Sequence, residues 1–579
     1  MTSFLGMEPH LIGSAATHTE FLCSTIGSAA NAANPATTAL MAAGGDEISR
    51  AAAATFSDFG VQYQAFLREL GTVNERFAAS LTAAGRAFAQ AEAEISATLG
   101  ISSRSLLSPD YSPALRATTP TPVDATLIMN GSGAPTPSQK YINAVLPRFL
   151  TGFTSSVVAG VSTPEGLYPI TGIKDLTLNI SLARGVTMLD NAIKDVLGPA
   201  PSTKTVSVFG YSQSAILSSL EMPKLLAAGY NPTNAAFTLI GNPANPNGGL
   251  FARFPGLSLP SLGITFGFST PSNAFPTTIW TLEYDGFADF PKYPINVLAD
   301  LNALAGIVYG HLTYPSMPEA QLNSAVALHQ SGAPSMTNYY MIPSKNLPLL
   351  EPLRAIPFLG NPLADLVQPN LRYLINWGYG DINYGWSTTP ADVPTPFGFL
   401  PPWETTGAIL GPALIRGAQE GINAFTAGIA AQLPTAPPTL PTMPSLQTLP
   451  NLFAGATPTG FGTPPTLPSL SSIIAGIQTA NTNLSTTLVS DLSTAYATLL
   501  PTTDIAVALA VSAPSYNLNL FLDGINQAIT GDPIGGLINA IGRPISADVG
   551  LLTFGTGIGL LAAGNSLQTI LLGIPSPRP

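Results

Sequence analysis

Apolar and polar positions follow a helical rhythm in the first hundred residues of this chain. Large apolar side chains recur every three or four positions, which aligns them on one helical face as Phe56, Phe59, Tyr63, Phe66, Leu67 and Leu70. Residues 1–98 contain no proline besides Pro9 and Pro35. The pattern predicts a two-helix hairpin over residues 1–98. Because two helices bury little surface, the apolar face is expected to pack against a partner or against the rest of the chain.

The pattern changes to short apolar runs after residue 122. Residues 99–122 are rich in Ser, Thr and Pro and predict a linker. Apolar runs typical of buried strands then end at polar or glycine-containing loops, at 125–129, 205–209, 236–240 and 278–284. Helical segments between such strands indicate an α/β domain, here residues 123–400, with its site at the carboxyl ends of the strands.

The last part of the chain, residues 401–579, is poor in charge and rich in Pro and Gly. Proline every few residues over 433–470 predicts an extended spacer, and 471–499 could form amphipathic helices. The uncharged stretch 549–574 is interrupted by glycines, so it is interpreted as a buried or surface-adhesive segment rather than a membrane helix. No chemistry is predicted in this region.

Composition narrows the class of protein. Only 9% of the 579 residues are charged and the net charge is −11, which argues against a nucleic-acid partner. The single cysteine, Cys23, excludes an internal disulfide, and the 45% hydrophobic content argues against disorder. The start of the chain lacks the basic and apolar regions of a signal peptide. No motif predicts a cofactor or a metal site.

The strongest chemical signal is the pentapeptide Gly-Tyr-Ser-Gln-Ser at residues 210–214, between an apolar strand and a helical segment. This context is typical of a nucleophile elbow, in which small flanking residues allow a tight turn that exposes the serine oxygen. The predicted nucleophile is Ser212. The second flanking position, usually Gly, is Ser214 here.

A serine nucleophile needs a base and an acid that orients the base. Outside the N-terminal hairpin the histidines are His311 and His329, and His311 is favoured because it begins a loop, whereas His329 is expected on a helix surface. Asp285 ends a predicted strand and is the expected acid, with Asp289 as the alternative. The order Ser212, Asp285, His311 is the order found in α/β-hydrolases.

The charge that develops on the attacked carbonyl oxygen also requires donors. One is expected to be the backbone N–H of Gln213, which follows the nucleophile. The other is expected from the loop at residues 130–133, where Ser132 could add its hydroxyl.

The first hundred residues resemble the mycobacterial PE domain. The likeness lies in residues 26–70, with the elements DEIS and YQAF, although Glu8-Pro9 stands where the family has Pro-Glu. The resemblance implies pairing with a PPE-family protein through the N-terminal helices and export by type VII secretion. The family's export signal, Tyr followed four positions later by an acid, corresponds to Phe88 and Glu92. The implied location is secreted or at the cell surface or cell wall, without a conventional signal peptide.

A second resemblance covers about residues 123–390. The elbow sequence is written as in cutinases, and the segments TPEGLYPITG, GNPANPNGGLFARFPG and YDGFADFPKYPINVLADLNALAGIVYGHLTY are similar to the PE-PPE domain, a cutinase-like serine hydrolase. The resemblance implies hydrolysis of acyl or lipid esters at the cell envelope, with Ser212, Asp285 and His311 as the triad. Some relatives are acyltransferases on trehalose glycolipids. An acyltransferase and a non-catalytic surface interaction protein are therefore the alternatives to an esterase.

Overall fold

The computed structural model describes residues 119–430 and 499–572, with residues 111–113 and isolated positions elsewhere. The chain forms two compact units, Met1–Ser108 with Pro402–Ile415 and Pro109–Pro401 with Arg416–Pro579. Most described residues belong to the second unit. The predicted N-terminal hairpin, its apolar face and the spacer at 433–470 lie outside the described residues, apart from isolated helical positions in the hairpin.

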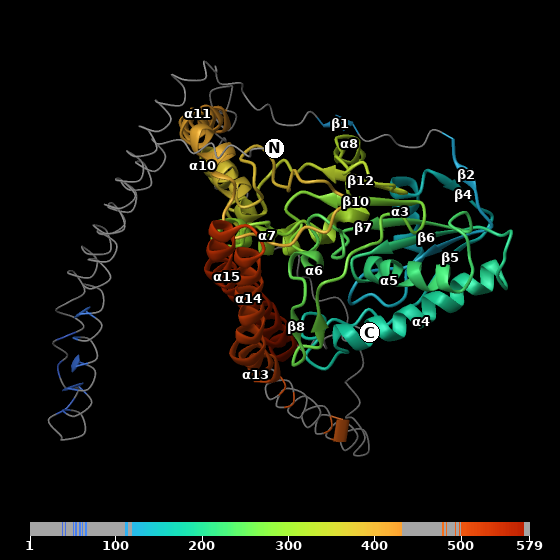
Figure 1. Ribbon diagram of the computed structural model, residues 1–579, viewed down its shortest axis with the longest axis horizontal. Helices are drawn as coiled ribbons and strands as arrows, with labels where there is room; N and C mark the ends of the chain where they lie inside the picture. The colour runs from blue at the N-terminus through green and yellow to red at the C-terminus, as the bar shows by residue number, and fades with distance from the viewer. Residues whose placement is uncertain are drawn as a thin grey trace, which may run out of the picture. The chain divides into compact units, whose positions relative to one another are not determined.

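The second unit is built on an eight-stranded sheet (Figure 1). Its strands lie in the order β1-β11-β12-β10-β7-β6-β3-β5, and the six from β12 to β5 are parallel, while β11 and β1 pair antiparallel at one edge. The bounds are β1 Ser112–Pro113, β3 Ala125–Ile128, β5 Val158–Gly160, β6 Val206–Tyr211, β7 Ala235–Ile240, β10 Thr277–Leu282, β11 Val326–Ala327 and β12 Thr337–Ile342.

The four apolar runs predicted as strands are confirmed as β3, β6, β7 and β10, which are neighbours in the sheet. Alternate side chains along a strand point to opposite faces of the sheet. In β6, Val206 and Val208 join one hydrophobic cluster, and Phe209 and Tyr211 join another. Because both faces are covered, the parallel strands are continuously buried.

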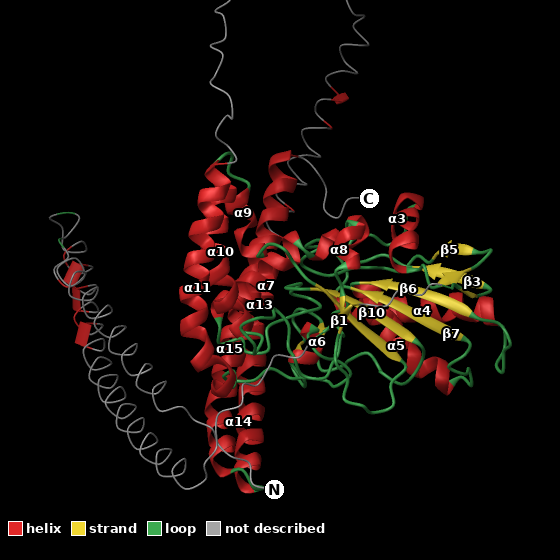
Figure 2. Cartoon of the chain, turned by 90° about the horizontal axis from the view of Figure 1, so that it is seen from above, coloured by secondary structure: helices red, strands yellow, loops and turns green. Residues whose placement is uncertain are grey.

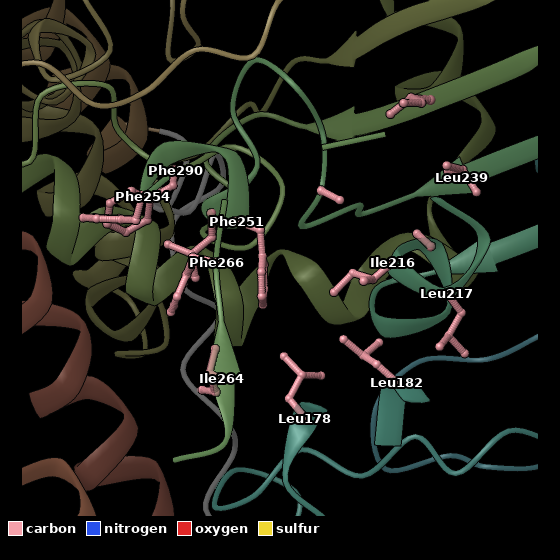
Figure 3. Packing of buried hydrophobic residues seen from close by; sticks show 14 of the residues in the cluster. Leu178, Leu182, Ile216, Leu217, Leu239, Phe251, Phe254, Ile264, Phe266 and Phe290 are labelled. Atoms are coloured by element: carbon pink, nitrogen blue, oxygen red, sulfur yellow. The ribbon is translucent and has the colours of Figure 1, made fainter. Parts of the chain in front are cut away.

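One face of the sheet is covered by α4 (Leu178–Leu197) and α5 (Gln213–Ala227), whose Leu182, Ile216 and Leu217 are buried in the first cluster (Figure 3). The other face is covered by α3 (Gln139–Phe149), the 3₁₀ turn η1 (His311–Ser316) and α8 (Glu319–Asn323). Helices on both faces of a mostly parallel sheet define an α/β fold.

Further helices and two small sheets complete the described α/β part. The helices are α6 Leu250–Arg253, α7 Val297–Tyr309, η2 Pro348–Leu350, α9 Glu351–Arg354 and α10 Gly360–Trp377. Helix α11 (Trp403–Ala430) belongs to the first unit up to Ile415 and to the second from Arg416. The small sheets pair β2 (Thr121–Pro122) with β4 (Phe153–Thr154) and β8 (Ser258–Leu259) with β9 (Ile264–Thr265).

Part of the segment expected to be a linker contributes β1 and β2 instead. The two-residue strand β1 contains Pro113 and pairs with β11 at the sheet edge. Proline is compatible with an edge strand because one side of such a strand needs no ladder partner. A two-residue strand leaves no periodicity to find in the sequence.

The C-terminal helices pack against the α/β domain within the second unit. They are α13 Leu499–Val507, the π-helical turn η4 Ala508–Ser512, α14 Ala513–Ile529 and α15 Pro533–Leu572. Helix α15 lies beside α7, and α13 and α14 pack on α15 (Figure 2). Glycines allow the close approach. A Cβ on Gly524 of α14 would come within 2.3 Å of the Ala540 nitrogen of α15, and one on Gly557 would come within 2.7 Å of Leu304 of α7.

Helix α15 is apolar on more than one face. Ala547, Leu551, Phe554 and Ile558 are buried at helical spacing, whereas Leu552 and Leu560 are 51% and 70% exposed. The stretch interpreted as buried or surface-adhesive is thus buried on one face and exposed on another, and its adhesion to a surface stays a prediction. Two described stretches, Leu500–Ile529 and Pro533–Gly564, are long and apolar enough to cross a membrane. Packing of the α15 inner face on the α/β domain explains part of this apolar character.

Candidate active site

The turn between β6 and α5 carries Ser212 on a strained backbone. Ser212 has φ 56° and ψ −117°, a conformation that places its side chain at the top of the turn. A Cβ at Gly210 would lie 2.7 Å from the carbonyl oxygen of Ser214, so this position must be glycine. The Ser214 hydroxyl accepts a hydrogen bond from the Tyr211 N–H (2.8 Å) and donates to the Tyr211 carbonyl (3.0 Å). Serine therefore fits the second position that flanks the nucleophile, and its hydroxyl stabilises the turn.

The structure brings Ser212, His311 and Asp285 together in one hydrogen-bonded chain. Nε2 of His311 lies 2.8 Å from Oγ of Ser212, and Nδ1 lies 2.8 and 2.9 Å from the two carboxylate oxygens of Asp285. All three side chains are buried, with Ser212 the most exposed at 7%. With Nδ1 donating to Asp285, Nε2 is the acceptor for the Ser212 hydroxyl.

Several donors hydrogen-bond to the side chain of Asp285, which is fully buried. Besides His311, the Phe287 N–H (3.1 Å) and the Tyr314 hydroxyl (2.9 Å) donate to its carboxylate. Burial, reinforced by the neighbouring Asp285 charge, raises the pKa of Tyr314 well above its usual value, so Tyr314 remains a donor. These bonds offset the cost of burying the carboxylate and fix its direction.

The imidazole ring of His311 is held on several sides. Tyr211 stacks on it with a centroid separation of 5.3 Å, and Phe287 meets it edge-on at 4.9 Å. The Tyr211 hydroxyl also donates to the His311 carbonyl (2.6 Å). Gly241, at the end of β7 with φ 52°, has no side chain to obstruct the ring, since a Cβ there would lie 2.9 Å from Cε1 of His311.

The two alternative residues lie elsewhere. His329 is exposed and follows the short strand β11, with its ring 5.2 Å from that of Tyr111, so the helix expected around it is wrong. Asp289 is buried, and one of its oxygens accepts the Tyr284 N–H at 3.0 Å. Burial raises the pKa of Asp289 well above its usual value. The carboxylate hydrogen-bonded to His311 is that of Asp285.

The residues predicted to stabilise the oxyanion, Gln213 and Ser132, lie beside Ser212. Gln213 is the first residue of α5, so its N–H has no acceptor within the helix. The Ser132 hydroxyl donates to Oε1 of Gln213 at 2.9 Å. A Cβ on Gly131 would lie 3.2 Å from Cβ of Ser212, which shows how closely this loop approaches the nucleophile.

Glu165 supports the same loop and was not singled out from the sequence. It has φ 51°, and its carbonyl accepts the Gly133 N–H at 2.7 Å. Its side chain is fully buried, with one oxygen bonded to Thr163, and burial raises the pKa of Glu165 to about 8. Glu165 lies in the TPEGLYPITG segment that resembles the PE-PPE domain, but that resemblance assigned no role to this glutamate.

A largely apolar pocket opens beside the triad. Ser132, Ser212 and Gln213 supply polar groups to its wall, and the space between the lining residues measures about 510 Å³, part of it open to solvent. Five lining residues, Leu178, Ile216, Phe251, Ile264 and Phe266, are labelled in Figure 3. Phe554 and Ile558 of α15 also line the pocket. These two residues were not predicted from the sequence, because no chemistry was expected in residues 401–579.

Among the described residues, no cluster of three or more His, Cys, Asp or Glu side chains could hold a metal ion. The candidate site combines a strand–turn–helix serine, a histidine and an aspartate at the carboxyl edge of a mostly parallel sheet. These residue types, in this chain order, are the ones expected of the α/β-hydrolase class.

Within that class, comparison with known proteins defines the family. Residues 5–95 match the PE family model, and residues 155–380 match the PE-PPE domain. The chain belongs to the PE family of mycobacterial proteins and carries a PE-PPE domain. Both resemblances noted in the sequence are confirmed. The PE-PPE match begins after β3 and the loop that holds Ser132, and it ends before α13.

Three relatives from Mycobacterium tuberculosis illustrate the range of the family. The uncharacterized PPE family protein PPE28 is 46% identical over 78% of this chain and 67% of its own length. Esterase PE16 is 38% identical over 69% of this chain and 72% of its own length. SL1278 acyltransferase Chp1 is 31% identical over 38% of this chain and 53% of its own.

Among solved structures, a cutinase-like protein from Cryptococcus sp. matches 34% of this chain and 87% of its own, with 18% identity and a TM-score of 0.22.

The buried Glu165 predicts a pH-dependent stability. Its pKa rises from an ordinary 4.5 to about 8 on folding, so the folded chain holds this proton more tightly than the unfolded chain. That stabilisation is complete below pH 4.5 and is lost as the pH rises toward 8. From about pH 5 to about pH 8, the free energy of unfolding should fall more in wild type than in Glu165→Gln.

Urea unfolding followed by circular dichroism at both pH values measures this difference. Glu319→Gln, which changes an exposed glutamate, is the matched control and should follow wild type. An equal fall in wild type and Glu165→Gln would contradict the prediction.

Proposed function

We propose that this protein is a serine esterase that hydrolyses acyl or lipid esters through Ser212, His311 and Asp285. The observation that carries the proposal is the hydrogen-bonded chain from Oγ of Ser212 through the His311 ring to Asp285, with both steps within 2.9 Å. Membership in a family that includes Esterase PE16 supports an ester substrate. The apolar pocket beside Ser212 supports a hydrocarbon group in that substrate.

In the first half of the reaction, Nε2 of His311 accepts the hydroxyl proton of Ser212 while Oγ attacks the ester carbonyl carbon. The carbonyl oxygen becomes an oxyanion, which the Gln213 N–H and the Ser132 loop stabilise. Asp285 stabilises the imidazolium that forms. Collapse of the tetrahedral intermediate breaks the ester bond, and the alcohol leaves with the proton from His311. An acyl group remains on Ser212.

In the second half, His311 takes a proton from a water molecule, which attacks the acyl-enzyme. The resulting intermediate releases the carboxylic acid, and His311 returns the proton to Oγ of Ser212. Water is consumed once, and the enzyme is regenerated.

An acyltransferase is the second candidate function, favoured by the similarity to SL1278 acyltransferase Chp1. In that reaction a sugar hydroxyl replaces water in the second half and takes the acyl group from Ser212. Both candidates share the acyl-enzyme. Adding trehalose to the ester assay separates them, because acylated trehalose forms at the expense of free acid only in the transferase.

We also propose that the PE region directs this enzyme to the cell surface or cell wall, or out of the cell, in association with a PPE-family partner. The PE family match at residues 5–95 and the predicted apolar helix face support this part of the proposal. No residue of the proposed triad lies in that region.

Replacing the nucleophile should abolish the reaction. Ser212→Ala removes the covalent route, so kcat/KM for p-nitrophenyl butyrate should fall at least about 10³-fold. A fluorophosphonate probe should label wild type and not the variant. Circular dichroism checks that both are folded. Substantial turnover or labelling in folded Ser212→Ala would remove Ser212 from the mechanism.

The histidine and aspartate assignments predict two contrasts. His311→Ala should approach Ser212→Ala in severity, whereas His329→Ala, an exposed change, should not. Asp285→Asn should lose about 10³- to 10⁴-fold, because an amide cannot hold the reactive tautomer. Asp289→Asn can still accept the Tyr284 N–H and should retain most activity. Steady-state ester hydrolysis measures all four variants, and greater damage from Asp289→Asn than from Asp285→Asn would reassign the acid.

The PE region should be dispensable for chemistry and necessary for export. A chain lacking residues 1–98 keeps every residue of the proposed triad, so its ester hydrolysis in vitro should stay within about three-fold of the full chain. In a mycobacterial host the truncated chain should remain in the cell, as measured by immunoblots of culture medium and cell-surface fractions. A truncated chain that reaches these fractions would refute the export role. A truncated chain that folds but does not hydrolyse esters would show that the chemistry needs the PE region.

A further inference from the structure

We propose that the C-terminal helix α15 forms one wall of the acyl-binding pocket and sets the acyl chain length that the enzyme accepts. The inference rests on the proposed function and adds a binding site for an extended acyl chain. It depends on Phe554 and Ile558, which line the pocket and lie outside the PE-PPE match.

The chemistry of the pocket points to a hydrocarbon ligand. Ser132, Ser212 and Gln213 are the groups assigned to the reaction, and most of the remaining lining is aliphatic or aromatic. No Asp, Glu, Lys or Arg is among the lining residues. An acyl chain is the part of a lipid ester that fits such a wall, because polar alcohol groups would lose hydration there without gaining partners. The acyl side of the substrate is therefore assigned to this pocket.

Phe554 and Ile558 are held firmly in that wall. They are 8% and 4% exposed, and they lie one helical turn apart on the inner face of α15. Phe554 meets Phe290 edge-on, with ring centroids 6.5 Å apart. Gly557, between the two pocket residues, fits closely against Leu304 of α7, which fixes the position of the helix relative to the α/β domain.

The pocket is also tied to the neighbouring helix α13. The hydroxyl of Tyr168, another lining residue, donates to Oδ2 of Asp504 at 2.6 Å. The Ser261 hydroxyl donates to the carbonyl of Asp504 at 2.7 Å. Two hydrogen bonds on Asp504 therefore connect α13 to the α/β domain independently of the apolar contacts, and one of them is made by a pocket residue.

Chain-length selectivity tests the inference. Each methylene removed from water contributes about a four-fold gain in binding, so filling the space of two methylenes costs on the order of ten-fold. In Ile558→Trp, the ratio of kcat/KM for p-nitrophenyl octanoate to that for p-nitrophenyl acetate should fall about ten-fold. Phe554→Ala enlarges the pocket and should shift the preference from octanoate toward dodecanoate. The leaving group is constant throughout, so only the acyl side varies.

The matched control is Leu560→Trp, the same enlargement on the exposed face of α15, which should keep the wild-type ratio. Unchanged chain-length ratios in folded Ile558→Trp would overturn the inference. If Ile558→Trp fails to fold, Phe554→Ala decides, and no shift toward dodecanoate would overturn it.

Binding separates this inference from the proposed function. Calorimetry of sodium octanoate with Ser212→Ala measures pocket occupancy without turnover. Adding Ile558→Trp to that chain should weaken octanoate binding about ten-fold, and adding Leu560→Trp should not. Octanoate binding that is insensitive to Ile558→Trp would refute the acyl pocket even if Ser212 proves to be the nucleophile. Sensitive binding in an inactive wild type would refute the esterase proposal alone.

Discussion

The site depends on the sharp reversal of the chain at Ser212. Ser212, at φ 56° and ψ −117°, lies in a sparsely populated backbone region that costs a non-glycine residue about 1–3 kcal/mol. The surrounding contacts hold it there. Its N–H donates to the Ile240 carbonyl of the neighbouring strand at 3.0 Å, and the Ser214 hydroxyl bridges the N–H and carbonyl of Tyr211. The same turn starts α5, so the serine oxygen and the Gln213 N–H come from one rigid unit.

Two aspartates four residues apart show how environment assigns a role. Asp285 receives hydrogen bonds from the His311 ring, the Phe287 N–H and the Tyr314 hydroxyl, which together fix the direction in which its side chain meets the base. Asp289 is just as buried but has one oxygen without a hydrogen-bond partner, and burial raises its pKa. A buried acid with few donors holds its proton and is poorly suited to stabilise an imidazolium.

Four neighbouring strands of the sheet, β3, β6, β7 and β10, and the candidate nucleophile could be predicted from the sequence because both follow from local rules. Buried parallel strands are continuous apolar runs, and an elbow serine must stand between a strand and a helix, so β6 and Ser212 could be predicted. The choice of Asp285 over Asp289 was left open, because it depends on Tyr314 and Phe287, which meet the carboxylate only in the fold. Glu165 escaped notice for the same reason, since its role is a backbone contact to Gly133.

The buried face of the C-terminal helices could not be predicted from the sequence, for a physical reason. In α15 apolar residues occupy both the inner face, with Leu551 and Phe554, and the outer face, with Leu552 and Leu560. A helix that is apolar on two faces gives no periodicity to say which side is buried. The inner face is defined only by its neighbours on the α/β domain. Two of these neighbours leave no room for a side chain on α15, since a Cβ on Gly542 would lie 2.2 Å from Phe399 and one on Gly557 would lie 2.7 Å from Leu304.

The two proposals place the catalytic residues and the residues that select the acyl chain in different parts of the sequence. The proposed triad lies wholly within the PE-PPE match at residues 155–380, whereas the wall proposed to set chain length comes from α15, beyond residue 530. Relatives that share the matched domain and differ in their C-terminal helices would then share an acyl-enzyme and differ in the acyl group it carries. The proposed selectivity could then change without disturbing Ser212, because the described side chains of the helix line the pocket, while the hydrogen bonds of Ser212 and His311 are made to each other and to Asp285.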